Sequence, residues 1–374
     1  MHERLRITDG LAQIPESGWR ELAFGNPALR FEVLEAIEHS ATRQLNLQTF
    51  LLENDAGLAA AAVCESVTAP DAHNPLDSLL FGRAMRVART LAVSTRPVLL
   101  FSPPLGNGAA VILRNTGPGE RRRLLDRLLD GIGAHATKRK SGIAFIGVSG
   151  DDEMLTEALR DRGYLETEVQ PTTRLDVEWR DFEGYVDYLR RRSKSAAGTA
   201  RRERNRSRSS GVHIRSVPAG SVDTLAFYTL AREHYRHKNG GDLPYGPRFL
   251  PQLIQALGDD FLVFEAERHG QRVAMLGIVR SGTVGWLSCL GIDLRNRPND
   301  FTYFNLAYYH LADCAAALGL RTLLYGNGAY QAKRMRGCRL TVSRLFYHPY
   351  RSLRRLAARP YFRIHRAWYR RKLR

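Results

Sequence analysis

Hydrophobic and polar positions change their period several times along the chain, and each change predicts a new element. Residues 17–23 and 27–40 predict two short helices, and the second carries apolar side chains at near-helical spacing. Residues 45–54 and 57–64 are apolar runs separated by Asp55-Ala56-Gly57, which predicts a hairpin. The remainder of the first half predicts helices over 75–90, 119–137 and 151–162, and strands over 97–102, 109–113, 142–148 and 166–177.

The second half repeats this order of elements. Its pattern predicts strands over 212–217, 261–267, 272–280, 283–290, 321–325 and 341–347, and helices over 221–237, 247–257, 302–318 and 330–336. Helices followed by three consecutive strands, and then by alternating helix and strand, indicate a mostly antiparallel sheet with one parallel crossover. A doubly wound sheet would alternate strand and helix throughout. We therefore expect an α/β fold with mixed, mostly antiparallel sheets flanked by helices.

Length divides the chain into two lobes. A chain of 374 residues exceeds one ordinary core and fits two domains of roughly 150 to 180 residues. The expected boundaries are a first lobe over 1–180, a basic connecting helix over 181–210, a second lobe over 211–350 and a basic C-terminal tail over 351–374. Hydrophobic residues make up 44% of the chain, which is enough to fill both cores.

Cysteine use and apolar runs indicate a cytoplasmic protein. Cys64, Cys289, Cys314 and Cys338 are scattered without the close spacing of a metal or redox motif, so we expect reduced packing residues. The N-terminal residues lack an apolar core of signal-peptide length, and no stretch approaches about 20 uninterrupted apolar residues. We expect neither secretion nor a transmembrane segment.

Positive charge is concentrated in two segments. Residues 190–208 hold nine Lys/Arg and one acid, residues 351–374 hold ten Lys/Arg and no acid, and the formal net charge of the whole chain is +18. The rest of the chain is therefore neutral. Such segments suit a polyanion, because neutralising phosphates releases condensed counterions. The partner can be RNA, an acidic membrane surface or the phosphates of a nucleotide-linked substrate, and a solvated basic face is the alternative without a partner.

The element order and three short stretches resemble a known family. The stretches are Asn26-Pro27 with the helical Leu34-Glu35-Ala36-Ile37-Glu38, Ser193-Lys194 followed by Arg201-Arg202-Glu203-Arg204, and Tyr325-Gly326 leading to Lys333 and Arg336-Gly337. Over roughly residues 26–347 the chain resembles the tandem-GNAT "peptidoglycan biosynthesis/recognition" proteins, which are relatives of the Fem-type aminoacyl transferases. The resemblance implies two GNAT lobes, one that binds the acceptor and one that positions an aminoacyl-tRNA, without a metal.

One glycine-containing loop matches the phosphate loop of GNAT acetyltransferases. Arg114-Asn-Thr-Gly117-Pro-Gly119 has the R/Q-x-x-G-x-G form, follows a predicted strand and opens a helix, so backbone N–H groups can approach a pyrophosphate there. An ordinary turn before a helix is the alternative, and Pro118 removes one donor. The equivalent position in the second lobe, 295–300, has no glycine, although Arg295 and Arg297 offer two charges for phosphates.

Four residues of the second lobe are candidates for the chemistry of acyl transfer. Lys333 follows the strand that ends at Tyr325, where it can neutralise an oxyanion or a phosphate. Tyr325 and Tyr330 are candidate proton donors to the leaving group, and Asp293 is a candidate base. The alternatives are a surface charge for Lys333, core tyrosines with wet hydroxyls and a turn-capping aspartate.

The basic segments are candidate RNA contacts. Arginine outnumbers lysine eight to one over 190–208, and the guanidinium fork suits phosphate geometry. The tail combines basic residues with Tyr361, Phe362, Trp368 and Tyr369, whose rings can stack on unpaired bases. Peripheral membrane contact through the tail is the alternative, although Pro360 would break a surface helix. The expected nucleic-acid-binding residues are Arg190, Arg191, Arg192, Arg201, Arg202, Arg204, Arg206, Arg208, Arg363 and Trp368.

Other chemistries have little support in the sequence. His234 and His237 have i, i+3 spacing on a predicted helix, but no third metal ligand is placed near them, so we expect no metal site. No G-x-S-x-G stretch indicates a serine hydrolase.

These features predict an acyltransferase that forms an amide bond. The expected donor is aminoacyl-tRNA, with no tightly bound cofactor, and the expected acceptor is a small-molecule amine on a cell-wall precursor or a specialised metabolite. An N-acyltransferase that uses acetyl-CoA, another acyl-CoA or an acyl carrier protein is the alternative enzyme. A GNAT scaffold that binds RNA or membrane without catalysis is the alternative outside enzymes.

Overall fold

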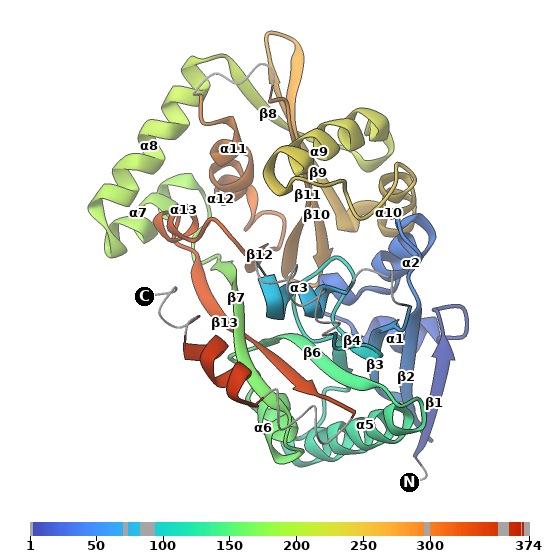
Figure 1. The fold of residues 1–374 in the computed structure, drawn as a ribbon. Helices are drawn as coiled ribbons and strands as arrows, with labels where there is room; N and C mark the ends of the chain where they lie inside the picture. Colours follow the sequence, from blue (N-terminus) through green and yellow to red (C-terminus); the bar gives the residue numbers. More distant parts are fainter. Residues whose placement is uncertain are drawn as a thin grey trace. The chain divides into compact units, whose positions relative to one another are not determined.

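The chain forms two units, each built around one sheet, in a computed structural model that describes residues 3–69, 74–82, 94–294, 300–350, 359–367 and 369 (Figure 1). Unit 1 comprises residues 1–23, 45–171 and 341–374, and unit 2 comprises residues 24–44 and 172–340. Strand β7 (Leu165–Asp176) begins in unit 1 and ends in unit 2.

The sheet of unit 1 has the order β1-β2-β3-β4-β6-β13-β7, and β5 pairs with β3. The predicted hairpin is antiparallel, with its turn at Asp55-Ala56, and the β4–β6 pair is parallel. Besides β7, the strands are β1 (Arg4–Asp9), β2 (Leu47–Asn54), β3 (Gly57–Val67), β4 (Val98–Phe101), β5 (Val111–Leu113), β6 (Gly142–Ser149) and β13 (Arg339–His348). The helices are α1 (Glu16–Leu22), α3 (Pro75–Phe81), α5 (Pro118–Lys138) and α6 (Glu153–Asp161).

Helix α5 supplies one side of the main core of unit 1. Its leucines recur at helical spacing, and Leu124 and Leu128 pack in one buried cluster with Phe50, Phe101 and Phe145 of the strands. The rings of Phe101 and Phe145 are stacked with centroids 4.6 Å apart. The 3.6-residue apolar period therefore fixes which face of α5 meets the sheet.

The sheet of unit 2 has the order β7-β12-β11-β10-β9-β8, in which β11 and β12 are parallel and the pairs β9–β10, β10–β11, β8–β9 and β7–β12 are antiparallel. The strands that lie wholly in unit 2 are β8 (Val212–Val217), β9 (Phe261–Arg268), β10 (Gln271–Ser281), β11 (Val284–Ile292) and β12 (Thr322–Gly326). The helices are α2 (Phe31–Ser40), α7 (Phe182–Arg192), α8 (Lys194–Ser209), α9 (Thr224–Asn239), α10 (Phe249–Leu257), α11 (Thr302–Phe304), α12 (His310–Cys314) and α13 (Tyr330–Met335), with a π-helical turn at Asn305–Tyr309 and 3-10 turns at Pro27–Leu29, Ala219–Ser221 and Gly258–Asp260.

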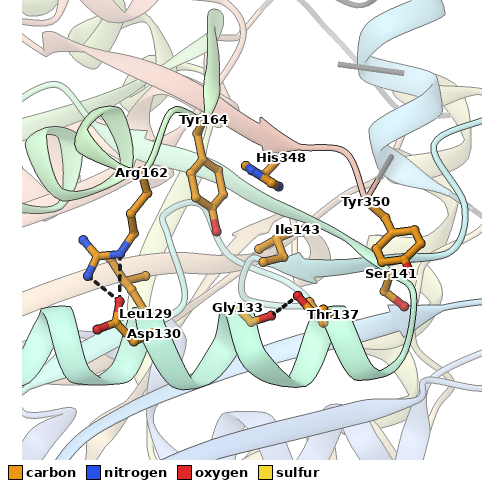
Figure 2. Close-up of a pocket in the computed structure, with 11 residues that line it drawn as sticks. Leu129, Asp130, Gly133, Thr137, Ser141, Ile143, Arg162, Tyr164, His348 and Tyr350 are labelled. Carbon is orange, nitrogen blue, oxygen red and sulfur yellow. Dashed lines mark hydrogen bonds and ion pairs between the residues drawn. The ribbon is translucent and has the colours of Figure 1, made fainter. Parts of the chain in front are cut away.

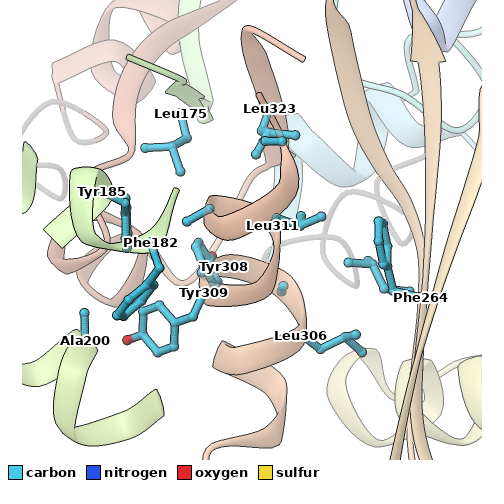
Figure 3. Close-up of a cluster of buried hydrophobic side chains, with 14 of the residues drawn as sticks. Leu175, Phe182, Tyr185, Ala200, Phe264, Leu306, Tyr308, Tyr309, Leu311 and Leu323 are labelled. Atoms are coloured by element: carbon cyan, nitrogen blue, oxygen red, sulfur yellow. The ribbon is translucent and has the colours of Figure 1, made fainter. Parts of the chain in front are cut away.

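The core of unit 2 is rich in aromatic residues. Tyr185, Tyr308 and Tyr309 are each at most 1% exposed and lie with Phe182 and Phe264 in one cluster between the helices and the strands (Figure 3). Buried phenol hydroxyls need partners, and the hydroxyl of Tyr185 donates to the carbonyl of Arg336 at 3.0 Å. The expected α/β class, with mixed sheets flanked by helices, is confirmed by this architecture.

Several boundaries differ from the expected ones. The single helix expected over 182–208 is two helices, because Ser193 is extended at φ −162° and its hydroxyl accepts from the N–H of Ala196 as the N-cap of α8. Both helices lie in unit 2 rather than between the lobes. The strand expected to end the second lobe, β13, pairs with β6 of unit 1 over residues 343–348, and residues 24–44 belong to unit 2. Strand β1 was not predicted.

The C-terminal residues also differ from a free basic tail. Residues 359–367 are helical, with Pro360 in the first turn, where its missing N–H costs nothing. Phe362 is 3% exposed and stacks on Tyr347, and the hydroxyl of Tyr361 donates to the carbonyl of Leu80. Tyr369 is also buried. Phe362 therefore packs in the core of unit 1, and neither Phe362 nor the buried Tyr369 is available to stack on RNA bases. None of the helices in the described ranges is long and apolar enough to cross a membrane.

Candidate active site

The parallel strands of unit 2 separate at their carboxyl ends. The β11–β12 ladder covers only three pairs, from Val284 with Thr322 to Trp286 with Leu324. Strand β11 continues to Ile292 and β12 to Gly326. Beyond Trp286, β11 has no β12 neighbour, so its backbone groups on that side can bond a substrate carbonyl or amide. This opening is the centre of the candidate site.

Lys333 closes the end of β12. The side chain projects from α13, is 4% exposed and donates to the carbonyls of Tyr325, Gly326 and Asn327 at 2.7, 3.2 and 3.0 Å. An ammonium group has three N–H donors, so these carbonyls use all of them. Lys333 therefore fixes the loop after β12 and places a positive charge at the opening, but its N–H groups are already engaged.

The pKa of Lys333 makes a prediction about stability. Burial lowers this pKa to about 8, whereas an unfolded lysine titrates near about 10.4. Between these values the unfolded chain binds more protons, so the contribution of Lys333 to the free energy of unfolding rises with pH by up to about 1.4 kcal/mol per unit. We expect the free energy of unfolding of the wild type to rise relative to that of Lys333→Met from pH 8 to pH 10 in guanidinium titrations.

The matched control for this measurement is Arg334→Met. Arg334 is the exposed neighbour of Lys333 on the same helix, and its replacement should leave the pH dependence of stability unchanged. If the free energy of unfolding of the wild type instead falls relative to that of Lys333→Met as pH rises, the three carbonyls, which favour the protonated amine, outweigh burial.

Tyr325 is a structural neighbour of Lys333. Its ring stacks on Tyr308 with centroids 4.5 Å apart, and its hydroxyl donates to the carbonyl of Ala307 at 2.8 Å. Burial raises the pKa of Tyr325 well above its ordinary value. The phenol of Tyr325 therefore keeps its proton and donates it in a hydrogen bond to Ala307. This contact favours a packing role for Tyr325 over the expected role as a proton donor to the leaving group.

Tyr330 and Asp293 are more accessible candidates. Tyr330 is the first residue of α13, one turn from Lys333, and is partly exposed; burial raises its pKa. Asp293 follows β11 directly, and its backbone N–H donates to the carbonyl of Val273 at 2.8 Å. Since carboxyl ends of parallel strands lie at the same edge of a sheet, Asp293 and the segment from Tyr325 to Lys333 share the edge where β11 and β12 separate.

A buried ion pair joins the arginine-rich helix α8 to this segment. Glu203 of α8 accepts from Arg336 at 2.6 Å, and their side chains are 8% and 4% exposed. Tyr309 of the π-helical turn also donates to Glu203, and the guanidinium of Arg336 lies 3.3 Å from the ring centroid of Phe304. Single π-helical turns are frequent at functional sites. Glu203, the one acid among the basic residues of α8, thus holds the helix against Arg336 and Tyr309.

The remaining polar face of α8 presents arginines to solvent. Arg202, Arg206 and Arg208 of α8, and Arg191 of α7, are exposed and pair with no acid in the part of the chain that the structure describes. Arg202 donates only to Thr199 at 3.4 Å. The other arginines expected as contacts over 190–208 are engaged. Arg190 pairs with Asp187, Arg201 with Glu183 and Arg204 with Asp313, and Arg192 lies 3.8 Å over the ring of Tyr188. We call Arg202, Arg206 and Arg208 the α8 arginine surface.

The glycine loop of unit 1 follows a strand and opens a helix, as expected, but its arginine already donates hydrogen bonds within the protein. It lies between β5 and α5, and no heavy atom lies within 4 Å of where a Cβ of Gly117 or Gly119 would be. The guanidinium of Arg114 instead donates to the carbonyls of Ala56 and Leu58 at 3.0 and 2.7 Å. If coenzyme A binds here, the exposed glycines and the amides at the start of α5 would hold its pyrophosphate, because Arg114 supports the β2–β3 hairpin.

The structure does not describe three of the expected binding residues. Arg295, Arg297 and Trp368 are not among the described residues. Arg363 lies on the C-terminal helix and is exposed.

His234 of α9 lies with Nδ1 3.2 Å from the carbonyl of Leu290, which places this helix against the open end of β11. The described residues include no group of three or more His, Cys, Asp or Glu side chains arranged to hold a metal ion.

Unit 1 contains a cavity of about 410 Å³ between α5, β6 and β13 (Figure 2). Its wall is mostly apolar, and Tyr164 projects its hydroxyl into it beside His348, with ring centroids 5.2 Å apart. Arg162 closes one end through an ion pair of 2.7 Å with Asp130. This volume and a few polar groups on an apolar wall are typical of small-molecule sites.

Sequence reasoning missed the groups that anchor and surround α8. Arg336, Tyr309 and Asp313 lie 133, 106 and 109 residues from their partners on α8. Only Glu203 carried a local signal, since a single acid within nine basic residues suggests a buried partner. The cavity of unit 1 has no such signal, because its walls come from distant elements.

Comparisons with known proteins agree with this fold. Residues 194–334 match the family model described as an acetyltransferase (GNAT) domain. The structure of FemX is similar with a TM-score of 0.61 and 11% identity over 95% of this chain and 99% of that one. The C-terminal domain of a lysylphosphatidylglycerol synthetase from Agrobacterium fabrum has a TM-score of 0.56 and 8% identity over 88% of this chain and 90% of that one.

A third structure, L-PGS from Bacillus licheniformis, has a TM-score of 0.52 and 12% identity over 88% of this chain and 95% of that one. No curated protein sequence matches the chain. The matched GNAT domain and the shared fold support an acyltransferase. The similarity to FemX shows a shared fold, as the resemblance to the Fem-like tandem-GNAT proteins implied.

Proposed function

We propose that the chain is a cytoplasmic aminoacyl transferase that moves an aminoacyl group from a charged tRNA to an amine, forming an amide bond. The acceptor would be a cell-wall precursor or a specialised metabolite, bound by the first lobe, and the second lobe would position the donor. The proposal assigns the candidate acyl-transfer chemistry to the opening between β11 and β12, with the charge of Lys333 opposite the developing oxyanion, and with Tyr330 and Asp293 as the accessible proton donor and base.

The α8 arginine surface is the observation that carries this proposal. Arg202, Arg206 and Arg208 have no acidic partner in the described chain, and they lie on the helix that Glu203 and Arg336 tie to the Lys333 segment. Unpaired guanidinium groups bind phosphates without first breaking an ion pair. An extended anionic donor suits this surface better than a compact one.

Coenzyme A is the second candidate donor, and one observation favours it. Gly117 and Gly119 are exposed with open space where side chains would be, as close approach of a phosphate requires. Against it, Arg114 is engaged by two carbonyls, and the acid Glu120 lies in the first turn of α5.

A donor comparison tests the proposal. The protein is incubated with radiolabelled aminoacyl-tRNA or with acetyl-CoA in the presence of amine mixtures, and loss of the ester or thioester is followed. The proposal expects amine-dependent loss of the aminoacyl ester that ribonuclease treatment abolishes. Consumption of the thioester alone would select the coenzyme A alternative, and neither reaction would favour a scaffold without catalysis.

RNA binding should depend on salt through the α8 arginine surface. We expect the triple variant Arg202→Ala, Arg206→Ala, Arg208→Ala to weaken tRNA binding and to reduce the slope of log K against log salt by about two to three. The matched control is Arg190→Ala, Arg201→Ala, Arg204→Ala, whose arginines already pair with acids. An unchanged slope in the first variant, or an equal change in both, would remove this surface from the RNA interface.

A further inference from the structure

A second cavity, of about 410 Å³, lies in unit 2 at the C-terminal end of the arginine-rich helix. Helix α8, strand β8 and the helical segment that contains the π-helical turn form its walls, so three stretches distant in sequence meet there. Its polar lining consists mainly of Arg204, Ser207, Arg208, His213, His310 and Asp313. We call it the α8 cavity.

Most of these polar groups have no partner in the described chain. Ser207 is 2% exposed, yet its hydroxyl makes no hydrogen bond with another described residue. His310 packs edge-on against Phe264 with ring centroids 5.1 Å apart, and its ring nitrogens make no hydrogen bond there either. Arg208 and His213 are exposed at the mouth and are equally unpartnered. The α8 cavity therefore offers a hydroxyl, a guanidinium and imidazole nitrogens to a polar ligand.

The charge of the α8 cavity favours an anion. Its single carboxylate, Asp313, is already committed, since it pairs with Arg204 and accepts from the backbone N–H of Phe182 at 3.1 Å. Arg208 adds an unbalanced positive charge. The hydroxyl of Ser207 and the imidazoles of His213 and His310 add hydrogen-bonding groups around the same space. A guanidinium surrounded by short donors matches the tetrahedral oxygens of a phosphate.

We infer that the α8 cavity is a binding site for a phosphate group, held by Arg208, Ser207 and the two histidines. This assignment does not require the donor of the proposed reaction to be RNA. The phosphate can belong to an RNA strand that follows the α8 arginine surface, or to a nucleotide-linked or otherwise phosphorylated small molecule.

Histidine NMR tests the inference with inorganic phosphate as the probe. The full chain is labelled with ¹³C-histidine, the signals of His213 and His310 are assigned with His213→Gln and His310→Gln, and phosphate is titrated at constant ionic strength. Both signals should move along one saturable curve. Arg208→Ala should weaken the apparent affinity about tenfold or more, because one charged hydrogen-bonding partner is lost.

Two further variants separate binding from folding and from general charge. Ser207→Ala removes the unpartnered hydroxyl without changing the packing volume greatly, and it should weaken phosphate binding about threefold to tenfold. Arg206→Ala removes one positive charge from the same helix outside the α8 cavity, and it should change the affinity less than about twofold. Histidine signals that do not respond to phosphate would overturn the inference, and so would an equal effect of Arg206→Ala and Arg208→Ala.

Three probes then distinguish the sources of the phosphate. A 5′-phosphorylated RNA oligonucleotide, the same oligonucleotide with a 5′-hydroxyl and a nucleoside diphosphate are compared on the wild type and Arg208→Ala. If Arg208→Ala lowers the affinity for the phosphorylated oligonucleotide most, the site binds a terminal RNA phosphate; if it lowers the affinity for both oligonucleotides equally, the site binds a backbone phosphate. If it lowers the affinity for the diphosphate most, the site binds a nucleotide. An unchanged affinity for every probe contradicts the site. The donor comparison above can fail while this site stands, because the two experiments share no readout.

Discussion

Arg336→Ala should lower the free energy of unfolding by about 3 to 5 kcal/mol. The variant leaves Glu203, which is 6% exposed, without its cation in an apolar environment, since Arg336 donates to it at 2.6 Å. It also removes the guanidinium that packs on Phe304. Guanidinium-induced unfolding followed by circular dichroism measures the loss.

A double replacement separates the ion pair from packing. Arg336→Met combined with Glu203→Leu removes both charges, and its stability should lie within about 1 to 2 kcal/mol of the wild type, because a buried ion pair contributes little compared with apolar residues of similar volume. Arg334→Ala, on the exposed face beside it, should have little effect. A loss below about 1 kcal/mol for Arg336→Ala would mean that Glu203 is not the buried anchor of α8.

Lys333→Ala should reduce turnover by about 100- to 1,000-fold. The replacement removes the positive charge at the carboxyl end of β12 and leaves the carbonyls of Tyr325, Gly326 and Asn327 without their donor. We therefore expect a fall in kcat that exceeds any change in KM, because a charge opposite the oxyanion acts mainly in the transition state.

The control for Lys333→Ala must separate chemistry from stability. Initial rates are measured at a temperature where circular dichroism shows the variant to be folded, and Arg334→Ala is measured beside it. If the folded variant retains the turnover of the wild type, Lys333 has only the structural role of holding the loop after β12.

Most secondary structure could be predicted because its signals are local. The leucines of α5 repeat every three to four residues, and the runs at 45–54 and 57–64 are separated by a turn, so both elements formed as predicted. The break at Ser193 also had a local signal, a serine N-cap, which was outweighed by the continuous polar pattern on both sides. Strand β1, with two apolar residues among six, had almost none.

The assignment of segments to units could not be predicted in the same way. Residues 24–44 pack in unit 2 through contacts such as that of Arg30 with Asp260 at 2.7 Å, 230 residues away. Strand β13 crosses back to β6. Pairings at such separations depend on side-chain complementarity that periodicity does not encode.

The candidate site shows the same limit at the level of single residues. The sequence located the positive charge on 190–208, but it could not show that Glu183 and Asp313 neutralise Arg201 and Arg204. It also placed Lys333 near the end of β12 without showing that three carbonyls engage its ammonium. Charge can be counted from a sequence, whereas ion pairs and burial require the fold.

The most direct measurement of the central claim is the chemical stability of the product. Aminoacyl-tRNA carrying a labelled amino acid is incubated with the protein and an amine acceptor, and the label is then exposed to mild base, which cleaves esters but not amides. The account predicts a base-stable labelled product that forms only with intact tRNA and that decreases in the Arg202, Arg206, Arg208 triple variant. Label that remains entirely base-labile, while acetyl-CoA yields a stable amide, would contradict it.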